Sequence, residues 1–306
     1  MEYPAAATRP RGGADVNHGS GLILTTSNGP VSVLTLNRPS RRNALNRDML
    51  LALGDVLAQV RMDARVSVVV LTGAGSSFCA GVDISDEGRR SFYQPPQQIE
   101  RLYQENGQGV VRALQSLPQV TVAAANGPAI GWGACLATCC DFGVVAAEAF
   151  FRIPEIGLGM YYDVGCLYGL LVLVGPARAK RMTMLGDDID AVEALRTGLA
   201  DDILSATDLM TAVDRVARSL LCRDSATQRN AKRRGHGATV GRRRPLGLME
   251  SEFTAVYYGG NLDRFEALAA FEEKRAPLFS RELEAGTLMR PPQRGEGGET
   301  HGFPSD

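Results

Sequence analysis

Two acidic side chains in one apolar stretch of this 306-residue chain are of the type that can move protons. Glu155 and Asp163 lie eight positions apart within RIPEIGLGMYYDVG (152–165), which is otherwise mostly apolar or glycine. A carboxylate in apolar surroundings has a raised pKa and can exchange protons near neutral pH. Two interpretations stay open from these residues alone: a pair of catalytic acids, or a helix cap at Asp163 with a loop salt bridge at Glu155.

Two glycine-rich turns could hold the oxygen atom of a substrate. Residues 76–84 (SSFCAGVDI) and 126–135 (NGPAIGWGAC) each follow an expected buried strand. Backbone N–H groups at such turns, and at the start of a helix, can point at one oxygen atom and form an oxyanion hole. The alternative is that the glycines serve only the turns or the close packing of a helix on a sheet.

Histidine content and missing motifs exclude several other kinds of enzyme. The three histidines are His18, His236 and His301, and all lie in polar or basic stretches. They are too few for a His-rich metal site and poorly placed for a Ser-His-Asp or Cys-His nucleophile. The sequence also contains no G-x-S-x-G, G-x-x-x-x-G-K-[ST] or G-x-G-x-x-G motif. An enzyme built from this chain would use carboxylates and backbone amides, with no metal or redox cofactor.

The overall composition argues against nucleic acid or a membrane as a partner. Lys+Arg number 33 and Asp+Glu 34, so the formal net charge of -1 gives no general attraction to an anionic surface. The longest aliphatic runs, such as 170–174, are far shorter than the about 20 apolar residues of a membrane span. Residues 1–20 show no secretory signal. We expect a soluble intracellular, cytoplasmic protein, with the organelle left open, and free buried cysteines rather than disulfides.

Hydrophobic periodicity predicts an α/β chain. Strands at 21–26 and 30–36 are expected to form a hairpin across Asn28-Gly29, and a helix over 47–60 is expected to be capped by Asn46. The next elements alternate, which favours βα or ββα turns. They are strands at 66–72, 119–124, 141–145 and 149–151 and helices at 97–115 and 133–138. After about residue 163 the pattern is mostly helical.

Four regions are expected along the chain: a flexible N-terminal segment (1–20), a core (21–205), a helical region (206–284) and a disordered tail (285–306). Within the helical region, residues 229–244 hold seven basic residues and no acid. The plain interpretation is a solvated loop, and the sharper one is contact with the phosphates of a ligand. Nucleic-acid binding is less favoured because no aromatic residues are interleaved.

Five ordered motifs resemble the crotonase superfamily, also called the enoyl-CoA hydratase/isomerase family. They are NRPSRRNALN (37–46), SSFCAGVDI (76–84), NGPAIGWGACLA (126–137), FRIPEIGLG (151–159) and RFEALAAFEEKRAPLF (264–279). The resemblance implies a spiral of ββα turns followed by a C-terminal helical region that makes the contacts of a homotrimer or homohexamer. It also implies acyl-CoA thioester substrates and stabilisation of an enolate.

The resemblance implies a set of site residues. The oxyanion hole of the superfamily uses the N–H after an Ala-Gly pair and one N–H of the glycine-rich turn, which correspond to Val82 and Trp132. The superfamily usually has glycine at the second position, so the indole could shape the acyl pocket. Arg42 would neutralise a phosphate. The residues implied to bind coenzyme A are Arg42, Ala44, Leu45, Ala80 and Asp83, with Lys274 and Phe279 of the terminal helix.

The catalytic positions favour one subfamily. Hydratases of the superfamily carry a glutamate at the position of Cys135 and another at that of Glu155. The run from Glu155 to Gly165, E-x-x-x-G-x-x-x-D-V-G, resembles Δ3,5-Δ2,4-dienoyl-CoA isomerases, which place a Glu and an Asp on either side of the acyl chain. We therefore predict an acyl-CoA double-bond isomerase of the fatty-acid β-oxidation type, with Glu155 and Asp163 catalytic. The alternatives are an enoyl-CoA hydratase, a one-base Δ3-Δ2 isomerase that uses Glu155 alone, and an inactive acyl-CoA-binding protein.

Overall fold

The computed structural model describes residues 15–18, 21–85, 107–160, 162, 166–233 and 262–277. Contacts divide the chain into two compact units, Met1–Gly260 and Asn261–Asp306. The expected N-terminal segment lies almost wholly outside the described residues, and the expected tail lies entirely outside them. The region boundaries expected from composition therefore stay predictions.

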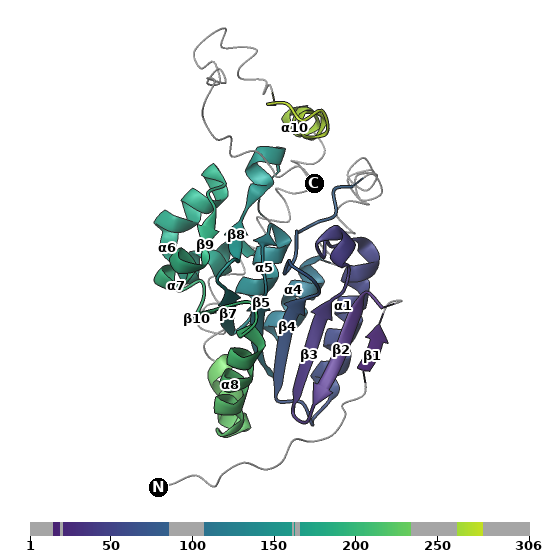
Figure 1. Ribbon diagram of the computed structural model, residues 1–306, viewed down its shortest axis with the longest axis vertical. Helices are drawn as coiled ribbons and strands as arrows, with labels where there is room; N and C mark the ends of the chain where they lie inside the picture. The colour runs from purple at the N-terminus through teal and green to yellow at the C-terminus, as the bar shows by residue number, and fades with distance from the viewer. Residues whose placement is uncertain are drawn as a thin grey trace. The chain divides into compact units, whose positions relative to one another are not determined.

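A seven-stranded sheet forms the centre of the first unit (Figure 1). Its order is β1-β2-β3-β4-β5-β7-β10, with β1, β2 and β3 antiparallel and the remaining pairs parallel. The predicted hairpin is confirmed, since Asn28 pairs with Val31 across a turn in which Gly29 has a φ of 58°. The strands are β1 (Asp15–His18), β2 (Ile23–Asn28), β3 (Val31–Leu36), β4 (Val68–Gly73), β5 (Val120–Ala125), β7 (Phe142–Ala146) and β10 (Asp202–Leu204).

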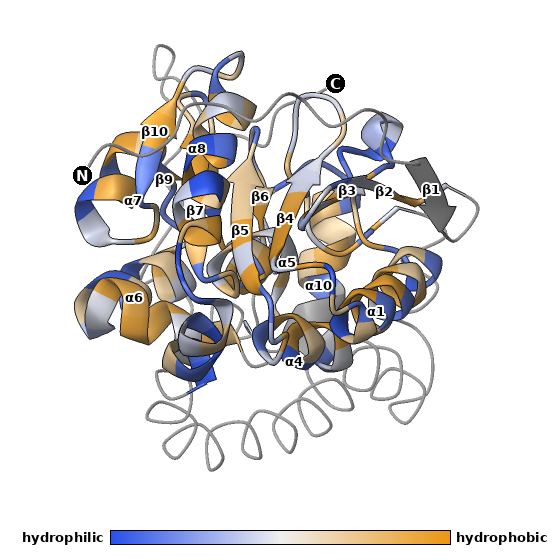
Figure 2. Ribbon diagram, turned by 90° about the horizontal axis from the view of Figure 1, so that it is seen from below, coloured by the Kyte–Doolittle hydropathy of each residue, from blue (hydrophilic) through white to orange (hydrophobic). Residues whose placement is uncertain are grey.

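Helices cover both faces of this sheet (Figure 2). The helix α8 (Leu209–Leu221) packs its apolar side on β4, β5 and β7, where Val68, Val122 and Val144 are buried against it. On the other face lie α1 (Arg47–Met62), α4 (Gly109–Gln115) and α5 (Trp132–Thr138). Because both faces are covered, β4 and β5 are buried at every position, as parallel strands usually are. The predicted cap of α1 is confirmed: Asn46 Oδ1 accepts the Met49 N–H at 3.0 Å.

Besides the short helical segments Pro39–Arg41, Pro154–Leu158 and Arg181–Leu185, the described part of the first unit has a small second sheet and three further helices. The sheet joins β6 (Ala129–Ile130), β8 (Phe150–Arg152) and β9 (Ile189–Asp190). The helices are α6 (Cys166–Lys180), α7 (Ala191–Thr197) and residues 225–233. The mostly helical pattern predicted after residue 163 is confirmed, but the short strands β9 and β10 interrupt it. No helix within the described ranges is long and apolar enough to cross a membrane.

One basic residue of the 229–244 stretch is buried, so the solvated-loop interpretation is wrong there. Residues 225–233 are helical, and Lys232 Nζ lies 2.6 Å from Asp141 Oδ2 with only 7% of its side chain exposed. The same carboxylate oxygen accepts the Thr121 N–H and hydroxyl at 2.7 and 2.8 Å. The ion pair therefore fixes this helix to the β5–β7 end of the sheet. Residues 234–244 lie outside the described residues.

The second unit contains one described helix, α10 (Leu262–Glu272), which lies within the helical region expected over 206–284. Arg275, just beyond the helix, lies 2.5 Å from a carboxylate oxygen of Glu266 and the same distance from one of Glu273. These ion pairs fold the chain that follows the helix back onto its last turns.

Candidate active site

Direct backbone contacts join the two glycine-rich turns. The N–H groups of Phe78 and Cys79 both lie 3.1 Å from the Pro128 oxygen, and the Ile130 N–H donates to the Cys79 oxygen at 2.9 Å. Gly133 permits this approach, because a Cβ there would lie 2.2 Å from the Cys79 oxygen. The structure thus confirms a packing role for this glycine and also brings together the two turns that were expected to bind one oxygen.

Val82 and Trp132, the two expected oxyanion donors, lie on adjacent segments. The Leu45 N–H donates to the Gly81 oxygen at 2.7 Å, and the Asp83 N–H donates to the Leu45 oxygen at 3.0 Å. In this ladder the N–H of Val82 faces away from Leu45. A Cβ at Gly81 would lie 3.5 Å from the Trp132 backbone nitrogen, which is the first of α5. That both amides bind one oxygen stays a prediction.

Glu155 reaches the turn that carries Trp132. It lies in the 3₁₀ helix Pro154–Leu158, is half-buried, and its Oε2 atom is shielded from solvent. Its Oε1 atom lies beside Gly131, where a Cβ would be only 2.5 Å away. Gly131 has a φ of 52°, a backbone conformation that favours glycine, and a side chain there would displace the Glu155 carboxylate. Asp163 lies outside the described residues, so its role as acid or helix cap stays a prediction.

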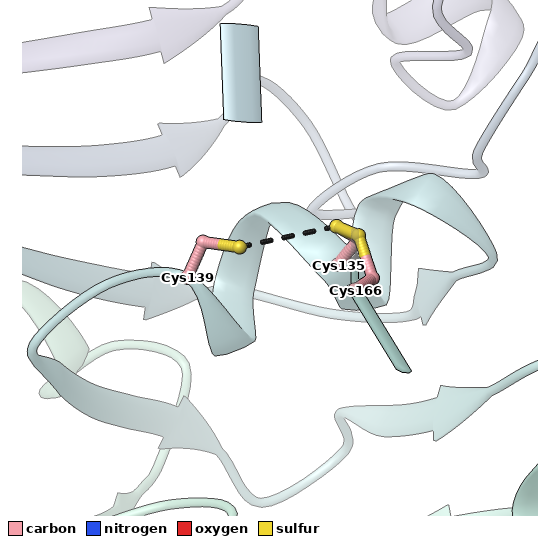
Figure 3. Close-up of side chains that lie close together, drawn as sticks. All are labelled: Cys135, Cys139 and Cys166. Atoms are coloured by element: carbon pink, nitrogen blue, oxygen red, sulfur yellow. Dashed lines mark hydrogen bonds between the residues drawn. A yellow bond between two sulfur atoms is a disulfide. The ribbon is translucent and has the colours of Figure 1, made fainter. Parts of the chain in front are cut away.

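Cys135, at the position where hydratases of the superfamily are expected to carry a glutamate, is bonded to another cysteine (Figure 3). Cys135 and Cys166 form a disulfide with Cα atoms 5.4 Å apart, within the usual range for such a bond. The expectation of free thiols is wrong for this pair, because α5 and the first residue of α6 meet although they are 31 positions apart. It is confirmed for the remaining cysteines, Cys79, Cys139, Cys140 and Cys222, although Cys222 is exposed rather than buried.

Cys139 completes a cluster of three sulfur atoms. Its Sγ lies 3.9 Å from that of Cys135 and accepts a hydrogen bond from Gln115 Nε2 at 3.1 Å. The three sulfurs lie within 4.8 Å of one another, which would suit a soft metal ion if all were thiolates. With Cys135 and Cys166 joined, Cys139 is the only thiol of the group, so the oxidised cluster is no metal site.

The residues expected to bind coenzyme A come from two segments that lie side by side. The Ala80 N–H donates to the Arg42 oxygen at 2.9 Å, and the Leu45–Val82 pairing continues this contact. The side chain of Arg42 is exposed, whereas Ala44 and Leu45 are buried. Lys274 is exposed in the second unit, and Phe279 lies outside the described residues. Coenzyme A binding by these residues stays a prediction.

The Asp83 side chain anchors these segments to Arg38, a residue that sequence reasoning missed. Arg38 Nη1 lies 2.5 Å from Asp83 Oδ2 and donates to the Ala44 oxygen at 3.2 Å. Burial alone would raise the pKa of Asp83, but hydrogen bonds from Ser85 and Arg38 outweigh it and hold that pKa below its usual value. The carboxylate therefore stays ionised and keeps the two segments in place.

Asn43 is a second important residue that the sequence reasoning missed. It is completely buried, and its φ of 58° lies in the left-handed region that asparagine tolerates. Its side chain bonds to the backbone of the segment that leads into Val82, through the oxygens of Ala74, Ser77 and Phe78. The asparagine of N-A-L in the 37–46 motif was the available signal, since an asparagine in a turn can supply both αL geometry and hydrogen bonds.

The fold and these turns define a crotonase-type α/β protein, and comparisons with known proteins agree. A family model described as Enoyl-CoA hydratase/isomerase matches residues 26–282. The chain is 34% identical over 260 residues to a protein named Crotonyl-CoA hydratase from Syntrophomonas wolfei, covering 84% of this chain and 97% of that one. The chain therefore belongs to the enoyl-CoA hydratase/isomerase family.

Solved structures show the same likeness. An enoyl-CoA hydratase/isomerase from Pseudoalteromonas atlantica superposes with a TM-score of 0.74 at 29% identity, covering 85% of this chain and 100% of that one. A monofunctional enoyl CoA isomerase from M. smegmatis superposes with a TM-score of 0.57 at 31% identity, covering 71% of this chain and 93% of that one. The spiral α/β fold expected from the motifs is thus confirmed.

Proposed function

We propose that the protein is an acyl-CoA double-bond isomerase in which Glu155 moves the proton. One observation carries this proposal: the position at which hydratases hold one of two glutamates is Cys135, whose sulfur is bonded to Cys166. A disulfide sulfur neither takes up nor releases a proton, so it cannot share the activation of water with Glu155. A double-bond shift needs only a carboxylate that takes a proton from one carbon and a group that returns one to another.

In the proposed mechanism, the thioester oxygen accepts hydrogen bonds from the N–H groups of Val82 and Trp132. These donors stabilise the negative charge that develops on that oxygen as the enolate forms. Glu155 takes the proton from C2, and its carboxylate lies beside Gly131 in the turn proposed to hold the thioester oxygen. On a 3,5-dienoyl thioester, Asp163 would supply the proton at C6, and on a 3-enoyl thioester Glu155 would return its own proton to C4.

The substrate is proposed to be an acyl-CoA thioester, with no metal or redox cofactor. We also propose that the chain assembles as a trimer or a dimer of trimers. Large apolar side chains exposed on α6, on α7 and between them support an assembly surface, since apolar patches on a surface often mark protein–protein contacts. They are Val172, Leu173, Met184, Leu185 and Val192. A purely monomeric sedimentation profile at micromolar concentration would contradict this assembly.

Hydration is the second candidate function. It is favoured by the name of the Syntrophomonas wolfei relative, which is a crotonyl-CoA hydratase. Glu155 would then have to activate water without a second carboxylate at the position of Cys135.

Three substrates given to the purified full chain separate these functions. The isomerase proposal expects 3-enoyl-CoA to become 2-enoyl-CoA and 3,5-dienoyl-CoA to become 2,4-dienoyl-CoA, both seen as a gain of absorbance from the conjugated thioester. Turnover of 2-enoyl-CoA alone, seen as a loss of that absorbance, would show a hydratase. Binding of all three without turnover would show an acyl-CoA-binding protein, and either result would overturn the proposal.

Two variants test the carboxylates. Glu155→Gln should lower isomerisation about 10²-fold or more, the usual order for loss of a general acid–base group. Asp163→Asn should nearly abolish dienoyl isomerisation while sparing the 3-enoyl shift. Glu148→Gln is the matched control, because Glu148 is an exposed acid in a turn seven residues before Glu155 and should leave rates unchanged. Full dienoyl activity in Asp163→Asn would show that Asp163 only caps a helix.

A further inference from the structure

The indole of Trp132 fits tightly against a neighbour that the proposed reaction does not use. Its six-membered ring lies on the backbone of Gly107, two residues before α4 begins. A Cβ at Gly107 would lie 2.0 Å from Cη2 of the indole and 2.3 Å from Cζ3. Trp132 is only 6% exposed, and Gly107 is buried. Even the smallest side chain at position 107 would collide with the ring. This packing of Trp132 therefore requires glycine at position 107.

The indole belongs to Trp132, whose backbone N–H is proposed to hold the thioester oxygen. At the preceding position, Gly131 lies beside the carboxylate of Glu155. The acyl carbons next to the thioester must lie within reach of that carboxylate for a proton to move. Under the proposed function, carbons further along the acyl chain run past the start of α5, where the indole lies against Gly107.

We propose that Trp132 sets the length of acyl chain that the protein accepts. Its indole, seated on Gly107, limits the acyl pocket beyond the thioester, so that short-chain enoyl thioesters are preferred over long-chain ones. This inference rests on the proposed function, because that function places the acyl chain at the turn of Trp132. A ring buried against backbone cannot swing aside without losing close packing, so the limit is built into the fold.

The first test compares two chain lengths within each variant. The measured quantity is the ratio of kcat/KM for 3-decenoyl-CoA to that for 3-hexenoyl-CoA, so a general loss of activity or stability cancels. In Trp132→Ala this ratio should rise at least tenfold over the wild type. Each methylene that becomes buried is worth about fourfold, which corresponds to about 0.8 kcal/mol. Trp132→Phe keeps an aromatic ring and should give a smaller rise, so the test survives if the alanine variant fails to fold.

Two further variants separate pocket size from other effects of losing the indole. Adding Gly107→Leu to Trp132→Ala should refill the space and return the ratio towards the wild-type value. The control Phe142→Ala removes an aromatic ring at the start of β7, outside the site, and should leave the ratio unchanged. An equal ratio in the wild type and both Trp132 variants would overturn the inference, as would a refilled variant that keeps the raised ratio.

Binding provides a test that does not depend on turnover. Trp132 is the only tryptophan of the chain, so its emission reports on this one site. Saturated hexanoyl-CoA should change the emission of the wild type, whereas coenzyme A without an acyl group should not. Decanoyl-CoA should bind no more tightly than hexanoyl-CoA. If no substrate is turned over, the proposed function fails while this series still tests the size limit. Affinity that rises about fourfold with each added methylene would overturn it.

Discussion

Replacing Asn43 by alanine should loosen the segment that carries Val82. The Nδ2 group of Asn43 donates to three backbone oxygens at 2.8 to 3.2 Å, and Oδ1 accepts one backbone N–H at 2.9 Å. Alanine has no side-chain amide, so these three backbone oxygens and one N–H would lose their partner. Asn43 is 0% exposed. Because a buried backbone group that loses its hydrogen bond is costly, the effect should be large.

The size of the effect follows from two separable contributions. Nδ2 has two hydrogens, so the side chain makes about three full hydrogen bonds, worth about 1 kcal/mol each. The φ of 58° adds roughly 1 kcal/mol, because alanine tolerates the left-handed region less well. Asn43→Ala should therefore lower the free energy of unfolding by about 4 kcal/mol. Asn43→Gly loses the hydrogen bonds but keeps the favourable backbone, so it should cost about 3 kcal/mol.

Urea unfolding, followed by circular dichroism and Trp132 emission, measures these differences. Asn46→Ala is the matched control: it removes the single cap bond of α1 and should cost about 1 kcal/mol. The kcat of Asn43→Ala should also fall, since Val82 is proposed to hold the thioester oxygen, while that of Asn46→Ala should not. If Asn43→Ala costs no more than Asn46→Ala, or Asn43→Gly costs more than Asn43→Ala, the reasoning is refuted.

The cysteines and Asp83 give four further tests. Reducing Cys135–Cys166 should lower the free energy of unfolding by about 4 kcal/mol, the chain-entropy value for a 31-residue separation, and an unchanged urea midpoint would contradict this. Labelling the denatured chain should modify four thiols without reductant and six with it. In the native state exposed Cys222 should react with iodoacetamide far faster than Cys79, whose pKa burial raises to about 12. The lowered pKa of Asp83 stabilises the fold above about pH 4 and this contribution is lost as pH falls through the folded-state pKa, so Asp83→Asn should flatten the acid limb of a stability–pH curve.

Much of the fold could be predicted because its signals are local. Alternating and continuous apolar runs marked β2, β3, β4 and β5, and Asn28-Gly29 marked the hairpin turn. Asn46 in front of an amphipathic run marked the start of α1. β10 was missed because its three residues carry too little pattern, and it becomes a strand only by pairing with β7.

The candidate site was only partly predictable, because local motifs can be recognised in the sequence but contacts between distant segments cannot. The motifs located Val82, Trp132 and Glu155, since each lies in a short segment with a recognisable pattern of glycines and apolar residues. Arg38 and Asn43 were overlooked, because their partners lie 45 residues and 31 to 35 residues away; the N-A-L asparagine was a signal for Asn43 but did not show which backbone groups it binds.

The sequence by itself determined the α/β class, the order of most elements between β2 and β8, and membership of the enoyl-CoA hydratase/isomerase family. Only the tertiary structure decided that Cys135 bonds to Cys166, that Lys232 is buried on Asp141, and that the indole of Trp132 rests on Gly107. Local periodicity specifies helices and strands through backbone geometry that each segment carries alone. Contacts between distant segments depend on how those elements pack. Neither composition nor local pattern predicts which side chains come into contact.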